Sequence, residues 1–531
     1  MSQDQFQNWL KNLESKISPV ELELGKESWN LATTGKKEHV EKVAKLRSEY
    51  RLIFTNKKEF EQLSLYKKNS SHWDPVIKRQ LEILWFQYAE NQMDANIIEK
   101  ISTLEADLES IYSNFRGKMD GKTIDNNTIR KVLKTSKDSN QCKAVWLASK
   151  QIGEEVKEKL LKLVHLRNEG ANKSGFNNYY AMSLELDELQ EKSLFSLLDD
   201  LAKKSKKAYL STKKELDQEL TEKFNISKNQ LRPWHYADPF FQEAPPSQEV
   251  DLNPKFKNID IIQLTKKTFE GLGFFIDDIL EKSDLFAREG KDQGAFCTMI
   301  GRTKDVRILC NLEPTEYWMS TMLHEMGHGI YDYYLEKNLP YFLYSPAHIL
   351  STEAIAMLFG RLTRNKFWLK IILGLPENEV ETIVKICITQ EKRSMLIFLQ
   401  WVLVMCHFER ELYNNPNQNL NHLWWQLVEK YQDISLEEER NKPDWGAKLH
   451  IALAPVYYQN YILGELTASQ LLNYLLKNFN HSNELIKNKN AGKFLKNNYF
   501  KHGASYPWDV LIQKVTGEKL NPNYYLKQFV D

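Results

Sequence analysis

Residues 315–334 read TEYWMSTMLHEMGHGIYDYY and contain an HEMGH motif that begins at His324. Residues four apart share one face of an α-helix, so His324 and His328 can present two imidazole rings to the same metal ion. Between them, Glu325 then points toward a water molecule beside that ion. Random placement of 12 histidines and 71 acidic residues in 531 positions gives about 0.04 matches to this pattern. The motif H-E-x-x-H is typical of metallopeptidases, in which the helix supplies two zinc ligands and a general base.

A third metal ligand is expected downstream, because a catalytic zinc site normally has three protein ligands and one open position. After a loop at residues 337–347, residues 351–362 (STEAIAMLFGRL) form a second segment with helical periodicity. Its apolar residues recur at three- and four-residue steps: Ile355, Leu358, Phe359 and Leu362. Burial of that face turns Glu353 toward the first helix, which makes Glu353 the predicted third ligand. The helix macrodipole alone also favours an acidic residue in a first turn.

The composition predicts a mainly α-helical fold. The chain has 21 glycines and 16 prolines in 531 residues, about 7% against a usual ~12%, and leucine-rich charged segments dominate it. Residues 1–290 are expected to be mainly helical. No Pro-, Gly- or Ser-rich linker divides the sequence, so we expect one large domain, 1–531, with two lobes.

Charge and hydropathy argue against nucleic-acid or membrane partners. The formal net charge is +1, and the most apolar run, residues 395–408, is shorter than the ~20 residues that span a bilayer. The sequence MSQDQFQNWLKNLES at the start lacks the basic residues and apolar core of a signal peptide. Five cysteines without a C-x-x-C pair suit reduced thiols, and we expect a cytoplasmic protein. A disulfide between Cys297 and Cys310 is a minor alternative.

A change of period at residues 294–312 predicts a β-hairpin just before the HEMGH helix. Two short strands, residues 296–300 and 306–310, flank the turn-forming sequence GRTKD. An edge strand beside a metal ion can bind an extended peptide through backbone hydrogen bonds. A hairpin that only packs against the helix fits the sequence equally well.

Two further segments contain polar and aromatic groups suited to a binding cleft. Residues 231–246 (LRPWHYADPFFQEAPP) combine four prolines with clustered aromatic residues, which suits either a loop lining a cleft or a hydrophobic cover. Residues 446–466 are rich in side chains such as His and Tyr, which can donate to the oxyanion of a tetrahedral intermediate. The polar residues of this segment are Lys448, His450, Tyr457, Tyr458 and Tyr461. The same run also fits an aromatic core helix.

Four stretches together resemble the angiotensin-converting-enzyme-like family of zinc peptidases. They are HEMGH, the downstream TEAIAMLFG, GAKLH followed by spaced tyrosines, and the terminal PWDVLIQKVTG. The matches span about residues 290–520, and the chain looks like a shorter, soluble bacterial-type member. The resemblance implies a two-lobed helical ellipsoid with one zinc ion in a deep central cleft. Residues 1–290 would then form the N-terminal lobe and lid, and residues 291–531 the zinc-site and substrate-binding portion.

The resemblance also implies a role for each motif residue. The two histidines of HEMGH and Glu353 would bind zinc, and Glu325 would act as the general base. His450 matches the histidine that stabilises the transition state. Lys448 matches the lysine that binds the C-terminal carboxylate of the substrate.

Two tyrosines three residues apart follow that histidine in the family. With one inserted residue they are Tyr458, for the carboxylate, and Tyr461, for the oxyanion, and this is the alignment that we favour. Without the insertion, Tyr457 takes the carboxylate role and Asn460 stands in place of the catalytic tyrosine.

Three departures separate this chain from the family pattern. Met357 stands where an aspartate orients a zinc-binding histidine, so the surroundings of the metal ligands must differ. Asn460 replaces an arginine that binds chloride, which argues against chloride activation. The loop between the two ligand helices is one residue longer than the vertebrate pattern, and this brings the spacing closer to that of thimet-type oligopeptidases.

The predicted function is therefore zinc-dependent hydrolysis of short peptides with release of C-terminal dipeptides, which the resemblance implies. One alternative is a thimet-type oligoendopeptidase that cleaves internally. Another is a peptide-binding protein without activity, which the complete set of predicted ligands argues against. The expected cofactor is one zinc ion and the expected partners are short peptides; the sequence does not predict the oligomeric state.

Overall fold

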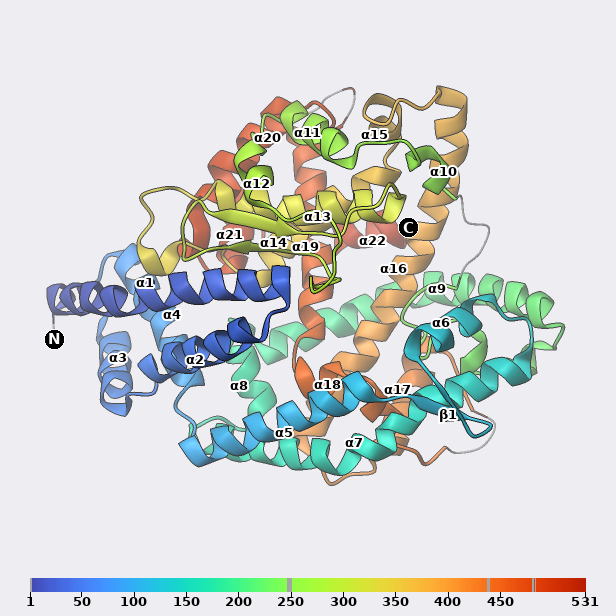
Figure 1. Ribbon diagram of the computed structural model, residues 1–531, viewed down its shortest axis with the longest axis horizontal. Coiled ribbons are helices and arrows are strands. Elements are labelled where there is room, and N and C mark those ends of the chain that lie inside the picture. Colours follow the sequence, from blue (N-terminus) through green and yellow to red (C-terminus); the bar gives the residue numbers. More distant parts are fainter. Residues whose placement is uncertain (1, 246–250, 437–439, 480–481, 483) are drawn as a thin grey trace. The chain divides into compact units, whose positions relative to one another are not determined.

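The computed structural model describes residues 2–245, 251–436, 440–479, 482 and 484–531. These residues form mainly α-helices, as the composition predicts, with two small antiparallel sheets (Figure 1). The chain divides into two compact units, each made of three separate segments. Unit 1 comprises Met1–Gln92, Val250–Lys385 and Leu463–Tyr524, and unit 2 comprises Met93–Glu249, Ile386–Ile462 and Tyr525–Asp531. A single domain with a functional boundary near residue 290 stays a prediction.

Unit 1 contains helices from all three of its segments. The first segment forms α1 (Gln3–Thr34), α2 (Lys37–Ile53), α3 (Lys57–Asn69) and α4 (Pro75–Glu90). The second forms α10 (Asn253–Phe256), α11 (Ile261–Gly271), α12 (Asp277–Lys282), α13 (Glu316–Tyr333), α14 (Ile349–Gly360) and α15 (Lys366–Ile371). The third forms α20 (Lys489–Phe494) and α21 (Trp508–Thr516). Its sheet consists of β3 (Phe296–Met299) and β4 (Val306–Leu309).

Unit 2 contains both long and short helices. They include α5 (Ala95–Asn114), α6 (Asn126–Thr135), α7 (Ser139–Lys173), α8 (Tyr179–Leu186), α9 (Glu191–Phe224), α17 (Leu420–Gln432) and α18 (His450–Leu453), with a small sheet of β1 (Gly117–Met119) and β2 (Lys122–Ile124). Three helices have residues in both units: α16 (Glu377–Asn414), α19 (Tyr458–Asn478) and α22 (Asn523–Phe529). Among the helices of the described residues, none combines the length and apolarity that a bilayer span requires.

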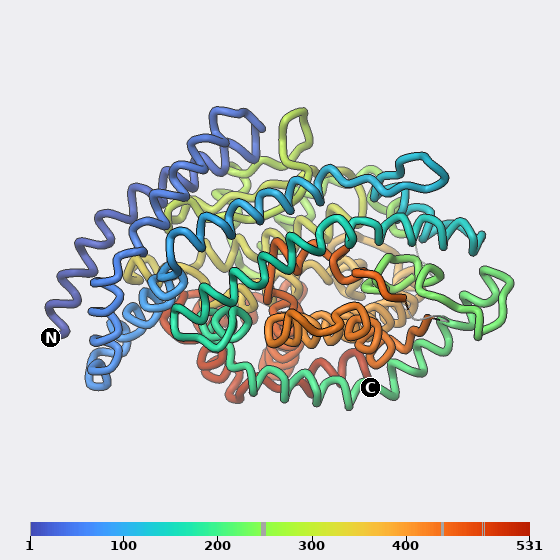
Figure 2. The backbone as a smooth tube through the Cα atoms, turned by 90° about the horizontal axis from the view of Figure 1, so that it is seen from below, coloured from blue at the N-terminus to red at the C-terminus, as the bar shows by residue number. Residues whose placement is uncertain are grey.

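Apolar spacing explains how the N-terminal helices of unit 1 pack. Phe6, Leu10 and Leu13 recur at helical steps on α1, and they are buried in one cluster with residues from α3 and α4. A capping box between Ser2 and Gln5 starts the helix by pairing two backbone N–H groups that would otherwise lack partners. In Figure 2 the blue helices α1 and α2 lie side by side as an antiparallel pair.

The predicted hairpin is present and packs against α13, the HEMGH helix. Its strands are antiparallel, with Cys297 opposite Ile308. Both strands are one residue shorter than predicted, and Ile300 instead closes the turn through a hydrogen bond from its N–H to the Asp305 carbonyl (2.8 Å). Cys297 and Cys310 are free thiols, so the alternative of a disulfide between them is wrong.

Helices α13 and α14, which contain the three predicted metal ligands, pack against each other. The Thr315 side chain accepts a hydrogen bond from the Trp318 N–H and caps the start of α13. The four predicted apolar residues are buried, Ile355, Leu358 and Phe359 in α14 and Leu362 in the 3-10 turn that follows it, and so are most other residues of α14. At the crossing of the two helices a Cβ atom added to Gly327 would lie 2.8 Å from the Ala356 Cα. A glycine is therefore required at this position for the helices to approach so closely.

Replacing Gly327 with alanine should force α13 and α14 apart. Overpacking of this kind costs about 1–3 kcal/mol, so we expect Gly327→Ala to lower the free energy of unfolding by that amount in urea titrations. Gly329→Ala is the matched control, because its added Cβ would lie 3.5 Å from the nearest atom, an ordinary contact. A Gly327→Ala protein as stable as the Gly329→Ala protein would contradict this account of the crossing.

Candidate active site

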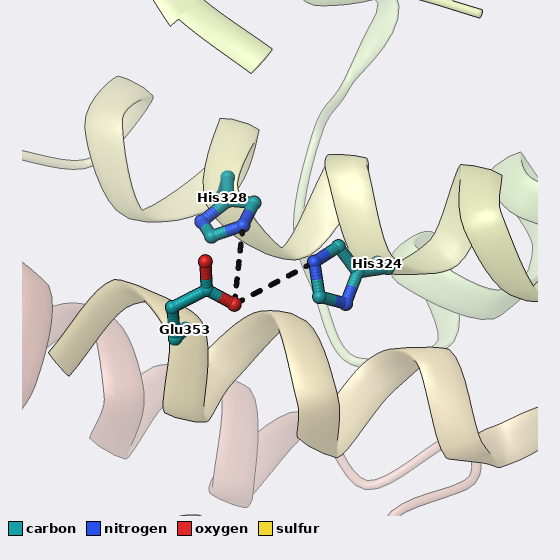
Figure 3. Close-up of side chains that lie close together, drawn as sticks. All are labelled: His324, His328 and Glu353. Carbon is teal, nitrogen blue, oxygen red and sulfur yellow. Dashed lines mark ion pairs between the residues drawn. The ribbon is translucent and has the colours of Figure 1, made fainter. Parts of the chain in front are cut away.

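Three side chains of unit 1 converge where α13 crosses α14 (Figure 3). One ligand-type atom from each of His324, His328 and Glu353 lies within 4.8 Å of the other two. Glu353 Oε2 is 3.7 Å from His324 Nε2 and 4.0 Å from His328 Nε2. Two imidazoles and one carboxylate are the donor set of many catalytic zinc sites, so these residues fit a divalent metal ion. The structure thus brings together the three residues that the sequence predicts as ligands.

Burial lowers the pKa of both histidines, which favours the neutral form that binds metals. The pKa of His324 falls to about 4 because its ring is removed from water. That of His328 falls to about 3, mainly through burial and further through the neighbouring His324 ring. Near neutral pH each ring is therefore neutral and carries a single proton, so that its other nitrogen can donate a lone pair to a metal ion.

The residue that orients His328 is Thr352, which the sequence analysis did not identify. Thr352 Oγ1 lies 2.7 Å from His328 Nδ1. When Nε2 binds a metal ion, Nδ1 carries the ring proton and donates it to this hydroxyl, which orients the ring. Met357, at the position of the family's aspartate, instead packs near Gly464. In this chain a hydroxyl, that of Thr352, therefore contacts a predicted ligand histidine where the family pattern uses an aspartate.

Glu325, the predicted base, lies near the hairpin. Its side chain is buried, and the neighbouring Cys297 backbone in β3 stabilises the charged form of its carboxylate to a small extent. Burial and the nearby charge of Glu353 raise the pKa of Glu325 to about 7. A divalent cation at the ligand atoms would act in the opposite direction and lower this pKa. Without a cation, burial and the charge of Glu353 thus favour the protonated form of this carboxyl.

The other predicted residues, Lys448, His450, Tyr458 and Tyr461, belong to unit 2 and are close to one another there. The ring centroids of His450 and Tyr458 are 5.0 Å apart, and those of Tyr458 and Tyr461 are 5.5 Å apart. Lys448 Nζ lies 5.5 Å from the centroid of the Tyr458 ring. Tyr458 therefore lies beside the predicted histidine and lysine, while the rings of Tyr457 and Tyr461 are 5.1 Å apart, and which tyrosines take the two roles stays a prediction.

Gln242 is a second polar residue that the sequence analysis did not single out. Lys448 Nζ donates a hydrogen bond to Gln242 Oε1 over 2.6 Å, and it also lies 5.5 Å from the centroid of the Phe240 ring. Both partners come from the aromatic, proline-rich segment 231–246, whose composition was the available signal. Burial lowers the pKa of Lys448 to about 8.

Asn460 does not offer a cationic group to an anion. Its side-chain amide donates to Asp187 Oδ2 over 3.0 Å. A neutral amide already bonded to a carboxylate is a poor replacement for the arginine that the family uses to bind chloride. The structure thus shows no positive charge on residue 460 that could bind chloride. That activity is independent of chloride stays a prediction.

Comparison with known proteins matches the two ends of the chain to two peptidase families. Residues 282–531 match the family described as peptidase family M3, and residues 1–235 match that described as angiotensin-converting enzyme. A mouse protein, angiotensin-converting enzyme-like protein Ace3, is 28% identical over 228 residues, which cover 40% of this chain. The chain spans only about 30% of the length of that relative. These matches support a metallopeptidase that acts on peptides and uses a divalent metal ion.

Removal of the Thr352 hydroxyl should weaken metal binding. Substitutions around metal ligands typically cost 10–100-fold in affinity, so we expect Thr352→Val to bind Zn²⁺ about 10–100-fold less tightly in competition with a chromophoric chelator. Thr321→Val is the control, because the Thr321 hydroxyl bonds only within α13, to the Tyr317 carbonyl. Equal affinities of the two variants would rule out the orienting role of Thr352.

Proposed function

We propose that this chain, which belongs to the angiotensin-converting-enzyme-like zinc metallopeptidases, hydrolyses short peptides and releases dipeptides from their free C-termini. The observation that carries the proposal is the convergence of three ligand-type atoms within 4.8 Å next to a buried glutamate. In this proposal His324, His328 and Glu353 hold one zinc ion.

Glu325 is the proposed general base and acid. When bound, zinc polarises the carbonyl of the scissile peptide bond and lowers the pKa of a neighbouring water molecule. Glu325 takes one proton from the attacking water onto its carboxylate and later delivers it to the leaving amine.

The aromatic and basic residues of unit 2 have two proposed roles. His450 and Tyr461 donate hydrogen bonds to the oxyanion, and loss of one such donor typically costs 10²–10³-fold in turnover. Lys448 and Tyr458 bind the C-terminal carboxylate of the peptide. The Lys448 ammonium has three N–H donors and uses one on Gln242, so donors remain for a carboxylate.

A second candidate is an oligopeptidase that cleaves internally. The observation that favours it is β3, which pairs with β4 alone within the described sheet and leaves its other edge without a strand. An extended peptide can bind such an edge through main-chain hydrogen bonds, and this mode needs no free C-terminus. The cleavage products of free and blocked peptides distinguish the two candidates.

Product analysis by mass spectrometry tests the proposed reaction. The same peptide is offered with a free and with an amidated C-terminus. We expect dipeptides to be released from the free acid only, and Glu325→Gln or a zinc chelator to abolish cleavage while Glu325→Gln retains zinc. Internal cleavage of both peptides would instead identify the oligopeptidase, and a Glu325→Gln enzyme with more than a few per cent of the activity would exclude Glu325 as the base.

The ammonium of Lys448 should make binding of free-acid peptides depend on pH. An amine is charged below its pKa, so the attraction to a carboxylate is present below about pH 8 and is lost as the pH rises through the pKa of Lys448. We expect KM for the free acid to rise above about pH 8. In Lys448→Gln, KM should be raised about 10–100-fold, the value of a hydrogen bond to a charged group, and should not change over this range. Lys442→Gln, which removes an exposed lysine of unit 2, is the control; a pH dependence that persists in Lys448→Gln would contradict the assignment.

A further inference from the structure

The turn between α18 and α19 contains a strained residue. This turn joins His450 at the start of α18 to Tyr458 at the start of α19. Within it, Val456 has a φ of +56°, in the left-handed region. A β-branched side chain is disfavoured there, because its Cβ crowds the backbone, so such a conformation persists only when its surroundings hold it in place.

A buried glutamate of α16 holds this residue. Glu409 Oε1 accepts a hydrogen bond of 3.0 Å from the Val456 N–H, and only 1% of the Glu409 surface is exposed. The Val456 carbonyl accepts a bond from Gln459 Nε2 in the first turn of α19. Both backbone polar groups of the strained residue are thus bonded to specific side chains.

An arginine of α7 holds the other end of the same turn. Arg167 Nη2 donates to the Ala452 carbonyl over 2.7 Å, and Nη1 lies 3.5 Å from the Ile451 carbonyl. The Arg167 guanidinium, itself 1% exposed, is oriented by Glu105 Oε1 at 2.7 Å and by the Tyr413 hydroxyl at 3.1 Å. Burial raises the pKa of Glu409 to about 7, and the Val456 N–H and the charge of Arg167 partly oppose that rise.

We infer that Glu409 and Arg167 form a clamp on the turn 451–456 and act as positioning residues for His450, Tyr458 and Tyr461. Neither residue touches substrate in this account, which rests on the proposed function for the roles of those three side chains. Glu409 and Arg167 form hydrogen bonds with backbone groups of one short turn. This turn connects His450 to Tyr458, whose ring centroids are 5.0 Å apart, and so determines their separation. It is also the segment in which the favoured alignment has an inserted residue, so the clamp holds a turn of altered length in one conformation.

The test uses a rescue that a purely structural role would not produce. Glu409→Leu removes the acceptor and leaves Val456 in a disfavoured conformation, so the turn should change. Adding Val456→Gly removes the steric penalty, because glycine adopts a positive φ readily. The turn should then regain its wild-type conformation. Glu409→Gln keeps an acceptor of the same shape. Tyr209→Phe, which removes a buried hydrogen bond to the Gln432 carbonyl elsewhere in unit 2, is the control.

Two readouts separate the clamp from the proposed function. In turnover of a free-acid peptide, we expect kcat to fall about 10²-fold in Glu409→Leu, the scale of a displacement of about 1 Å. It should recover at least about tenfold with Val456→Gly and stay near wild type in Glu409→Gln and Tyr209→Phe. Arg167→Leu, which removes the donors to the Ala452 and Ile451 carbonyls, should also lower kcat. Hydrogen exchange of residues 450–461 in the zinc-loaded protein without substrate should rise in Glu409→Leu and fall again in the double variant.

The outcomes are distinct. If Glu409→Leu loses stability as Tyr209→Phe does but keeps kcat and the exchange of residues 450–461, the clamp is wrong and Glu409 only supports the core. Failure of Val456→Gly to restore exchange and turnover also overturns it. If the wild-type protein cleaves no peptide, the proposed function fails, while the exchange measurement still decides whether the clamp exists.

Discussion

The metal-ligand residues depend on how closely α13 and α14 approach one another. Glu353 comes within 4.0 Å of both histidines only because the helices cross at Gly327, where no side chain intervenes. Gly464 of α19 also packs beside Glu353, but less tightly: a Cβ there would make an ordinary contact, 3.4 Å from the Glu353 Cβ. The ligands thus project from closely packed backbones, which limits their motion and preorganises their geometry.

The same close packing sets the electrostatics. Two carboxylates, Glu325 and Glu353, share a region from which water is largely excluded, and the pKa of each is raised by that burial. The histidines beside them have lowered pKa values for the same reason and contribute no positive charge near neutral pH. A divalent cation is the partner that this arrangement of neutral and negative donors favours, since it offsets the cost of burying both carboxylates.

The sequence was informative where local periodicity determines geometry. The i, i+4 spacing of the histidines and the apolar face of α14 were enough to identify His324, His328 and Glu353 as one group. Thr352 is next to Glu353 but was missed because a threonine is not a zinc ligand, and Gln242 was missed because its partner Lys448 is 206 residues away and chain packing alone brings them together. Val456 was hidden for a different reason: valine is among the last residues expected at positive φ, so no turn signal marks it. The sequence contains no linker between the two units, because two of the boundaries between them lie inside α16 and α19.

The discontinuous make-up of unit 1 has a consequence for synthesis on the ribosome. Both histidines and Glu353 are translated more than a hundred residues before the segment Leu463–Tyr524 that completes the unit and contains Gly464. Native contacts between such distant segments form late, after long loops have closed. A nascent chain therefore carries His324, His328 and Glu353 before it has the third segment of unit 1. Completion of the packing around the proposed metal ligands is then coupled to translation of that third segment.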